Sequence, residues 1–461
     1  MFYENEPKKV EEQEIIEIPL MDYVIENAPE GDRVTEFLQI FAEILRHSNY
    51  RSALEHYTRV TVKCSRCATQ CHVYQTTKDV HDIPCYRSEL LLSIYRRYFS
   101  YEGSIYSRLF SNFELTEEHI DKMAHSFWNC TACRKCVLEC PSGIDHGMIT
   151  HLGRYILAEM NLSPRALLIS TREQLHGKTA NTSAIPYIAM KDSLEFLEEE
   201  IEEMIDVKVK FPVDVENADY IFFAPVSDYL MEAETLMGIA TVLHAGNVSW
   251  TIGSKYYDAI NYGLFYSDLV LGRVLRKMED EVRRLKAKKV LIGECGHATR
   301  SATFLKTFWR GDDCPEVVNI MQLTHQLLKE GKIKLDPDKI KERVTYHDPC
   351  NIARQGWIVE EPREIINAFC SDFVEMTPNR TDAFCCGGGG GTVSIDEIRK
   401  YRTTIAGKKK ADQIKETGAH YVIAPCANCK KQFRELMEDN KVDGELVGLH
   451  DLIIKAIIVD K

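Results

Sequence analysis

The chain has 461 residues, of which 44% are hydrophobic and 28% are charged, a composition typical of a folded protein with two or three domains. The formal net charge of −13, without any concentration of Lys and Arg, argues against nucleic acid as the main partner. There is no apolar run of 18 residues and the N-terminus is charged, so we expect a cytoplasmic protein with no direct membrane span. In a reducing compartment, the sixteen cysteines favour metal or redox chemistry over structural disulfides.

The first half of the chain shows helical periodicity. Residues 1–35 are charged and irregular, and we expect a tail or docking arm there. Apolar residues recur at helical spacing in "VTEFLQIFAEILRH", "YRSALEHYTRVT" and "LTEEHIDKMAHSFWNC", with Thr116 as an N-cap, which predicts an α-helical domain over 36–170. Residues 171–210 form a predicted linker whose acidic run, Leu194 to Ile205, is most simply the solvated face of a helix. A recognition surface is the alternative.

After Asp206 the pattern changes to short apolar strands separated by helices. "YIFFAP", "KKVLIGEC", "VTYHDP" and "YVIAPC" are the predicted strands, and "DLVLGRVLRKMEDEVRRLK" and "EIRKYRTTIAGKKKADQIKETG" are predicted helices. This alternation indicates an α/β architecture with largely parallel strands. Chemistry in such sheets tends to lie at the carboxyl ends of strands, where Cys295, Cys350 and Cys426 fall.

The C-terminal half contains a repeat. "FAPVSDYL" aligns with "HDPCNIAR", "AINYG" with "AFCCG", and "LIGECGHA" with "VIAPCANC", with the first two pairs equally separated along the chain. We therefore predict a duplicated α/β unit, with a degenerate first copy over 211–330 and a second copy over 331–461. The alternative is chance similarity between two α/β units. Four of the five cysteine positions of the second copy carry other residues in the first.

The N-terminal cysteines have the spacing of iron–sulfur ligands. "CTACRKCVLECP" reads C-x2-C-x2-C-x3-C-P, which favours a [4Fe-4S] cubane over a zinc site, and in two-cluster proteins the fourth cysteine ligates the other cluster. "CSRCATQC" lacks its first member because Thr61 stands there, and His72 replaces the usual proline; Cys85 is the expected donor, with a buried structural thiol as the alternative. Applying the crossover, we assign one cubane to Cys71, Cys130, Cys133 and Cys136, and the other to Cys64, Cys67, Cys85 and Cys140.

The C-terminal cysteines exceed the needs of one simple site. Cys350, the adjacent Cys385 and Cys386, and the C-x2-C pair Cys426 and Cys429 make five, whereas a cubane or a zinc ion takes four. Five glycines follow the adjacent pair. We expect them to let the backbone approach a bulky cluster without Cβ clashes and to offer N–H groups to its sulfides.

These motifs match a known family. "PCNIAR", "CCGGGGG" and "APCANC" resemble the cysteine-rich CCG domain of heterodisulfide reductases, and over roughly residues 50–460 the chain is similar to the heterodisulfide reductase D family, most of all the K subunits of Dsr membrane complexes, with Hme and Tmc subunits nearly as similar. The resemblance implies an α+β multidomain fold with a ferredoxin-type two-cluster helical domain before a duplicated CCG domain. It also implies one noncubane [4Fe-4S] cluster, beside two cubane clusters, held by Cys350, Cys385, Cys386, Cys426 and Cys429.

The resemblance further implies a function. Electrons from a menaquinol-oxidising membrane cytochrome b would pass through the two cubanes to the noncubane cluster, which would reduce a disulfide or trisulfide on the sulfur carrier DsrC. The protein would be peripheral on the inner face of the cytoplasmic membrane, held there by other subunits of a Dsr-type complex. The alternatives are an iron–sulfur subunit of a 2-hydroxy acid or glycerol-3-phosphate dehydrogenase, a non-catalytic electron relay, and a zinc-stapled interaction module.

Several residues lie outside these sets. Cys295 occupies the repeat position of Cys426, so we expect Cys295 and His297 to face the cluster, as a substrate-facing thiol or extra cluster contact and as a proton donor. A buried remnant of a decayed site is the alternative. The cations available to steer an anionic partner, or to be ordinary solvated charges, are Arg300, Arg354, Lys430 and Lys431. The expected structural thiols are Cys314 and Cys370.

Overall fold

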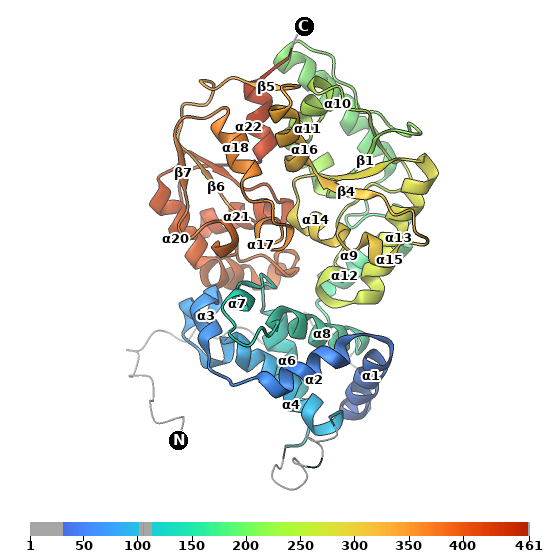
Figure 1. The fold of residues 1–461 in the computed structure, drawn as a ribbon, viewed down its shortest axis with the longest axis vertical. Coiled ribbons are helices and arrows are strands. Elements are labelled where there is room, and N and C mark those ends of the chain that lie inside the picture. The colour runs from blue at the N-terminus through green and yellow to red at the C-terminus, as the bar shows by residue number, and fades with distance from the viewer. Residues whose placement is uncertain (1–30, 101–104, 106–112, 460–461) are drawn as a thin grey trace.

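The computed structural model describes residues 31–100, 105 and 113–459, so the predicted N-terminal arm lies almost wholly outside the described residues. A helical part occupies one end of the molecule, and an α/β body with two sheets occupies the other (Figure 1). This arrangement confirms the predicted α+β multidomain class. The domain boundaries stay predictions.

The helical part forms where the sequence places N-caps and apolar stripes. The carboxylate of Asp32 accepts hydrogen bonds from two N–H groups of the first turn of α1, and Thr116 caps α6 in a reciprocal box with His119. The elements are α1 (Arg33–His47), α2 (Tyr50–Val60), η2 (Arg66–Gln70), α3 (His72–Thr77), η3 (Val80–Asp82), α4 (Pro84–Tyr98), α6 (Glu117–Trp128), α7 (Lys135–Leu138) and α8 (His146–Glu159).

Two helices, α9 (Arg165–His176) and α10 (Tyr187–Ile205), lead into the α/β body. α10 buries Met190, Leu194, Leu197 and Ile201 in the same hydrophobic core as the first sheet, while most of its glutamates stay on the outer face. The acidic run is therefore the solvated face of a packed helix.

The two sheets have the same topology. Each has four parallel strands, in the orders β2-β1-β3-β4 and β7-β6-β8-β9, so β1 corresponds to β6 and β3 to β8. The first unit contains β1 (Tyr220–Phe223), η4 (Val226–Tyr229), α11 (Ala233–Ala245), β2 (Trp250–Ile252), α12 (Gly263–Tyr266), α13 (Asp268–Leu285), β3 (Lys289–Ile292), α14 (Gly296–Ala302), α15 (Leu305–Phe308), β4 (Glu316–Asn319) and α16 (Ile320–Lys329).

The second unit repeats this strand order. It contains β6 (Val344–Tyr346), α17 (Ala353–Gly356), α18 (Glu361–Asn367), β7 (Phe373–Glu375), η5 (Arg380–Asp382), η6 (Thr392–Ser394), η7 (Asp396–Ile398), α19 (Arg399–Tyr401), η8 (Arg402–Ala406), α20 (Lys408–Thr417), β8 (Tyr421–Ile423), α21 (Ala427–Asn440), β9 (Glu445–Val447) and α22 (Leu449–Ala456). A small antiparallel pair, β5 (Lys334–Leu335) and β10 (Ile457–Ile458), joins the junction of the units to the chain end. The shared strand order supports the predicted duplication.

Helices of the two units pack against each other at their junction. α11 packs on α22 and α16 packs on α18, which is the reciprocal pairing expected when two copies face each other. At Gly238 a Cβ would lie 2.1 Å from the carbonyl oxygen of His450, so only glycine permits this approach of α11 to α22. Buried His450 also contacts Glu294 through Nδ1 at 2.5 Å and Thr324 through Nε2 at 2.9 Å. The carboxyl ends of the strands therefore meet near one junction.

One predicted helix is interrupted. Residues 397–418 form short 3₁₀ and α turns, a π-helical segment η8 and then α20, instead of one continuous helix. The carbonyl of Arg402 accepts a hydrogen bond from the Gln432 side chain at 2.8 Å, and the buried Arg402 guanidinium donates to the Gln432 oxygen at 2.8 Å. These bonds draw the Arg402 carbonyl towards α21, and π segments of this kind are frequent at functional sites. In the described part of the chain, no helix is long and apolar enough to cross a membrane.

Candidate metal centres

The first cysteine set lies on the outer side of the helical part. Cys64, Cys67, Cys85 and Cys140 all line one small cavity, beside Thr61. Contact with the Cys85 thiol, followed by burial, raises the pKa of Cys67. The structure thus brings Cys85, which is distant from the motif in sequence, to the other three thiols.

The second set lies deeper. Cys71, Cys130, Cys133 and Cys136 line one cavity, and between the last three Ala132 and Arg134 adopt left-handed backbone conformations that curl the loop. Burial, and then the neighbouring Cys133, raise the pKa of Cys136 well above its ordinary value. Thiolates can be held here only with a compensating positive charge.

The third set lies at the carboxyl ends of β6 and β8. The sulfurs of Cys386 and Cys429 are 3.5 Å apart, and contacts with Cys386 and Cys426 raise the pKa of Cys429 well above its ordinary value. Contact with Cys385 does the same for Cys350. All five cysteines expected from the CCG motif therefore form one cluster of thiols.

The three sets are adjacent. Cys136 packs against the small core cluster that contains Cys67, which links the first set to the second. Contact with the Cys385 thiol raises the pKa of Cys133, which links the second set to the third. The guanidinium of Arg354 donates to the carbonyl of Cys133 at 3.0 Å and to the carbonyl of Ala383, so it holds the two loops together. The cysteines form a continuous line through the protein.

Cys295 joins the third set. Its sulfur lies 3.6 Å from the sulfur of Cys426, and the side chain is fully buried. His297 is also fully buried, with Nε2 donating to the carbonyl of Asn261 at 2.7 Å and Nδ1 3.2 Å from the Asn428 amide. Burial lowers the pKa of His297. The imidazole is a neutral group with both nitrogens bonded.

Sequence reasoning missed His347. Its ligand nitrogen and the sulfurs of Cys386 and Cys429 all lie within 4.8 Å of one another, and neither ring nitrogen has a hydrogen-bond partner in the described chain although the side chain is buried. Lys410 is a second buried group near these thiols, and burial lowers its pKa to about 8. A histidine three residues before Cys350 was a signal in the sequence, but no spacing rule assigned it a role.

The glycine loop also packs closely on neighbouring backbone, while its expected role beside a cluster stays a prediction. A Cβ at Gly387 would lie 2.5 Å from the carbonyl oxygen of Arg402, and a Cβ at Gly389 would lie 2.4 Å from that of Thr131. At Gly390 a Cβ would lie 2.9 Å from the carbonyl oxygen of Cys130. The glycines therefore permit close packing of the loop on η8 and on the second cysteine loop.

Three of the four expected steering cations are engaged elsewhere. Arg354 and Lys430 are buried, and Lys430 lies near Asp451 and Glu232; Lys431 is exposed but paired with Asp396 at 3.3 Å. Arg354 and Lys430 therefore cannot steer a partner from the surface. Arg300 lines a separate cavity. Cys314 and Cys370 lie away from all three sets, as expected of structural thiols.

The donor sets fit iron–sulfur clusters. Four thiols around one cavity match the ligand number of a cubane, and they occur twice. The third set offers six thiols and an unpartnered imidazole, more than one zinc ion takes. Iron would supply the positive charge that such a buried thiolate group lacks.

Comparisons with known proteins agree with this chemistry. Residues 62–144 match a family model described as a 4Fe-4S dicluster domain, and residues 344–434 match the cysteine-rich CCG domain. An Hdr-like menaquinol oxidoreductase iron–sulfur subunit of Archaeoglobus profundus is 26% identical over 92% of this chain and 83% of its own length, and a second protein of that name, from Archaeoglobus fulgidus, is 25% identical over 91% and 83%. The dihydromethanophenazine:CoB--CoM heterodisulfide reductase of Methanosarcina mazei has a D subunit that is 24% identical over 86% of this chain and 93% of its own length.

This chain is a heterodisulfide reductase D-like protein. It is an iron–sulfur protein of the oxidoreductase kind, and its relatives are named as subunits of a menaquinol oxidoreductase and of a heterodisulfide reductase. The CCG match falls inside the second unit of the D-like protein, which is the unit that carries the third cysteine set.

Proposed function

We propose that this D-like protein is the catalytic iron–sulfur subunit of a membrane-associated complex. A cytochrome b partner would oxidise quinol, electrons would reach a noncubane [4Fe-4S] cluster through two cubanes, and a disulfide or trisulfide on DsrC would be reduced in dissimilatory sulfur metabolism. Bound clusters would supply electrons one at a time, whereas cleaving a disulfide needs two electrons.

The observation that carries the proposal is the unbroken line of thiols. Cys136 packs against the core cluster that contains Cys67, and Cys133 contacts Cys385, so a path runs from the outer cavity of the helical part to the CCG motif. Such contacts suit electron transfer between neighbouring groups in one chain. In the CCG set, Cys350 is only partly buried whereas the other four cysteines are buried, which favours approach of a substrate sulfur from its side.

The ligand assignments remain as the sequence suggests, with Cys64, Cys67, Cys85 and Cys140 in one set, Cys71, Cys130, Cys133 and Cys136 in the next, and Cys350, Cys385, Cys386, Cys426 and Cys429 in the third. We add that Cys295 is better placed as a sixth contact to the CCG cluster than as a substrate-facing thiol, because it is fully buried beside Cys426. His297, neutral and bonded at both nitrogens, is better placed to orient Asn428 than to deliver a proton.

A direct experiment measures thiol release. Anaerobically purified protein, reduced chemically, is mixed with DsrC carrying a trisulfide, and released thiol and sulfide are quantified. The proposal expects release that Cys350→Ser abolishes and that Cys370→Ser, a buried cysteine outside the sets, leaves unchanged. Release without loss in Cys350→Ser would refute the catalytic assignment. Electron uptake with no thiol release would favour the pure relay.

Electron paramagnetic resonance separates the Cys295 roles. Cys295→Ser is expected to change the spectrum of the CCG cluster in the oxidised protein while the cubane signals persist. An unchanged spectrum and unchanged thiol release would make Cys295 a remnant. Co-purification with a flavoprotein instead of a cytochrome b would favour the dehydrogenase alternative.

A further inference from the structure

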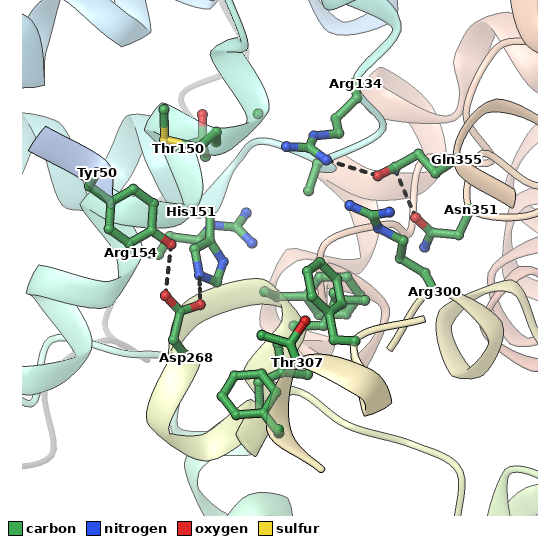
Figure 2. A pocket seen from close by; sticks show the side chains of 18 residues that line it. Tyr50, Arg134, Thr150, His151, Arg154, Asp268, Arg300, Thr307, Asn351 and Gln355 are labelled. Atoms are coloured by element: carbon green, nitrogen blue, oxygen red, sulfur yellow. Dashed lines mark hydrogen bonds and ion pairs between the residues drawn. The ribbon is translucent and has the colours of Figure 1, made fainter. Parts of the chain in front are cut away.

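A cavity of about 400 Å³ lies where the helical part meets both α/β units (Figure 2). Side chains from α2, α8, α12, α13, α14, α15 and α17 contribute to its wall. This volume is within the range of small-molecule sites. None of the cysteines described above lines it, so the cavity is separate from the three thiol sets.

One end of the cavity is cationic. Arg300 on α14 and Arg134 on the second cysteine loop both extend into it (Figure 2). Arg134 is already paired with Asp145 and donates to the Gln355 oxygen at 3.1 Å. Arg300 lies over the Phe304 ring at 4.9 Å, and it has no carboxylate partner among the described residues.

The charge on Arg300 has no direct ion pair in the described structure, although Asp145 lies close enough to favour its charged form. Burial, and then the nearby Arg134, lower the pKa of Arg300 to about 10, so the guanidinium is still charged at neutral pH. A group of this kind is stabilised when an anion reaches it. Arg300 is half-buried, and a guanidinium in such a position gains from an anion that bonds to it directly.

An amide donor lines the same cavity as Arg300. Gln355 donates to the side-chain oxygen of Asn351 at 2.9 Å, which orients the Asn351 amide. Within the described structure, the Asn351 side-chain nitrogen has no hydrogen-bond acceptor, and Asn351 and Arg300 line the same cavity (Figure 2). A guanidinium and an amide N–H₂ together form a donor set that suits an oxyanion.

The opposite end of the cavity does not neutralise these donors. Asp268 accepts hydrogen bonds from Tyr50 at 2.8 Å and from His151 at 2.9 Å. Burial alone would raise the pKa of Asp268, but these bonds outweigh it and lower the pKa. The carboxylate is therefore committed to its own partners.

The wall between the two ends is apolar. The side chains that form it are Met148, Leu264, Phe265, Leu271, Phe304 and Phe308. A ligand with only a small inorganic anion would leave this surface uncovered, whereas an apolar body would bury it.

We propose that this cavity binds a small organic oxyanion, a carboxylate, sulfonate or phosphate group on an apolar body, with Arg300 and Asn351 receiving the oxyanion. The site goes beyond the proposed disulfide chemistry, because its ligand contacts no thiol. It adjoins both electron-transfer loops, since Arg134 follows Cys133 and Asn351 follows Cys350 in the chain.

Calorimetry on the anaerobically purified holoprotein tests the proposal with three probes. 4-Phenylbutyrate carries a carboxylate and an apolar body, 4-phenylbutyramide carries the body without charge, and inorganic phosphate carries charge without the body. We expect 4-phenylbutyrate to bind, with the amide and phosphate each at least about tenfold weaker. Arg300→Gln should weaken 4-phenylbutyrate by about 10- to 100-fold.

Two further variants keep the test sharp. Arg343→Gln removes an exposed arginine that pairs with Asp372 away from the cavity, and it should leave binding unchanged. Thr307→Glu adds a carboxylate inside the cavity, so it should also weaken binding while the melting temperature shows that the protein is folded. Unchanged affinity in folded Arg300→Gln, equal affinity for the amide or for phosphate, or no 4-phenylbutyrate binding at about 10 mM would each overturn the proposal.

Discussion

Gly389→Ala is expected to disturb the junction between the CCG loop and the second cysteine loop. A Cβ at Gly389 would lie 2.4 Å from the carbonyl oxygen of Thr131, and atoms in such contacts need about 3.2 Å, so the loops must separate by roughly 0.8 Å. The backbone on both sides is fixed, because Arg354 bridges the carbonyls of Cys133 and Ala383. Overpacking of this kind lowers the free energy of unfolding by about 1–3 kcal/mol.

The assay pairs stability with cluster loading. Anaerobic denaturant unfolding gives the change in unfolding free energy, and iron analysis with electron paramagnetic resonance gives the clusters retained. We expect Gly389→Ala to lose the predicted 1–3 kcal/mol and up to about four iron atoms per chain, the content of one cluster. Gly293→Ala is the matched control, because its nearest new contact would be 3.4 Å and needs no shift.

Normal stability together with full iron content in Gly389→Ala would refute the close-approach reasoning. Equal losses in the Gly293→Ala control would do the same, since that site lacks the backbone clash. Loss of stability with full iron content would show that the junction matters for folding but not for holding the cluster.

Four further changes have defined outcomes. Gly387→Val should empty the CCG site but leave both N-terminal clusters, because φ is +97° at this position and the Arg402 carbonyl blocks a side chain. Iron analysis and resonance spectra test this, and three surviving clusters would contradict it. Cys85→Ala should lose one cluster's iron whereas Cys314→Ala keeps it. His347→Gln should shift the resonance spectrum of the CCG cluster without loss of iron. An unchanged spectrum would mean that the imidazole does not contact the cluster. Burial lowers the folded-state pKa of His146 to about 4, so unfolding free energy should fall by up to about 3 kcal/mol as pH drops from about 6.5 to 4, and His146→Asn should flatten that acid limb.

Local spacing in the sequence was enough to locate the iron–sulfur chemistry. Cysteines two or three residues apart on one loop must converge wherever that loop lies, so Cys130, Cys133 and Cys136 could be grouped without a structure. The four strands that the sequence predicts are confirmed, as β1, β3, β6 and β8. The predicted helix over residues 397–418 failed, because Gln432 on another helix draws away the Arg402 carbonyl.

The shared spacing of the two α/β units in the sequence was likewise sufficient to pair their strands. It could align Cys295 with Cys426, since each follows the corresponding strand. It could not show that their sulfurs lie 3.6 Å apart, because that distance depends on how the two units pack.

Tertiary structure decided everything that depends on contacts between distant loops. The partnerless imidazole of His347 beside Cys386, the approach of Gly389 to Thr131 and the cavity of Arg300 all join segments far apart in the chain. The sequence by itself predicted which cysteines of one loop group together, such as Cys130, Cys133 and Cys136, because ligand spacing within a loop is local. Only tertiary packing determined which other loops these cysteines lie against, because a contact between two loops stabilises the fold only when both loops are in place.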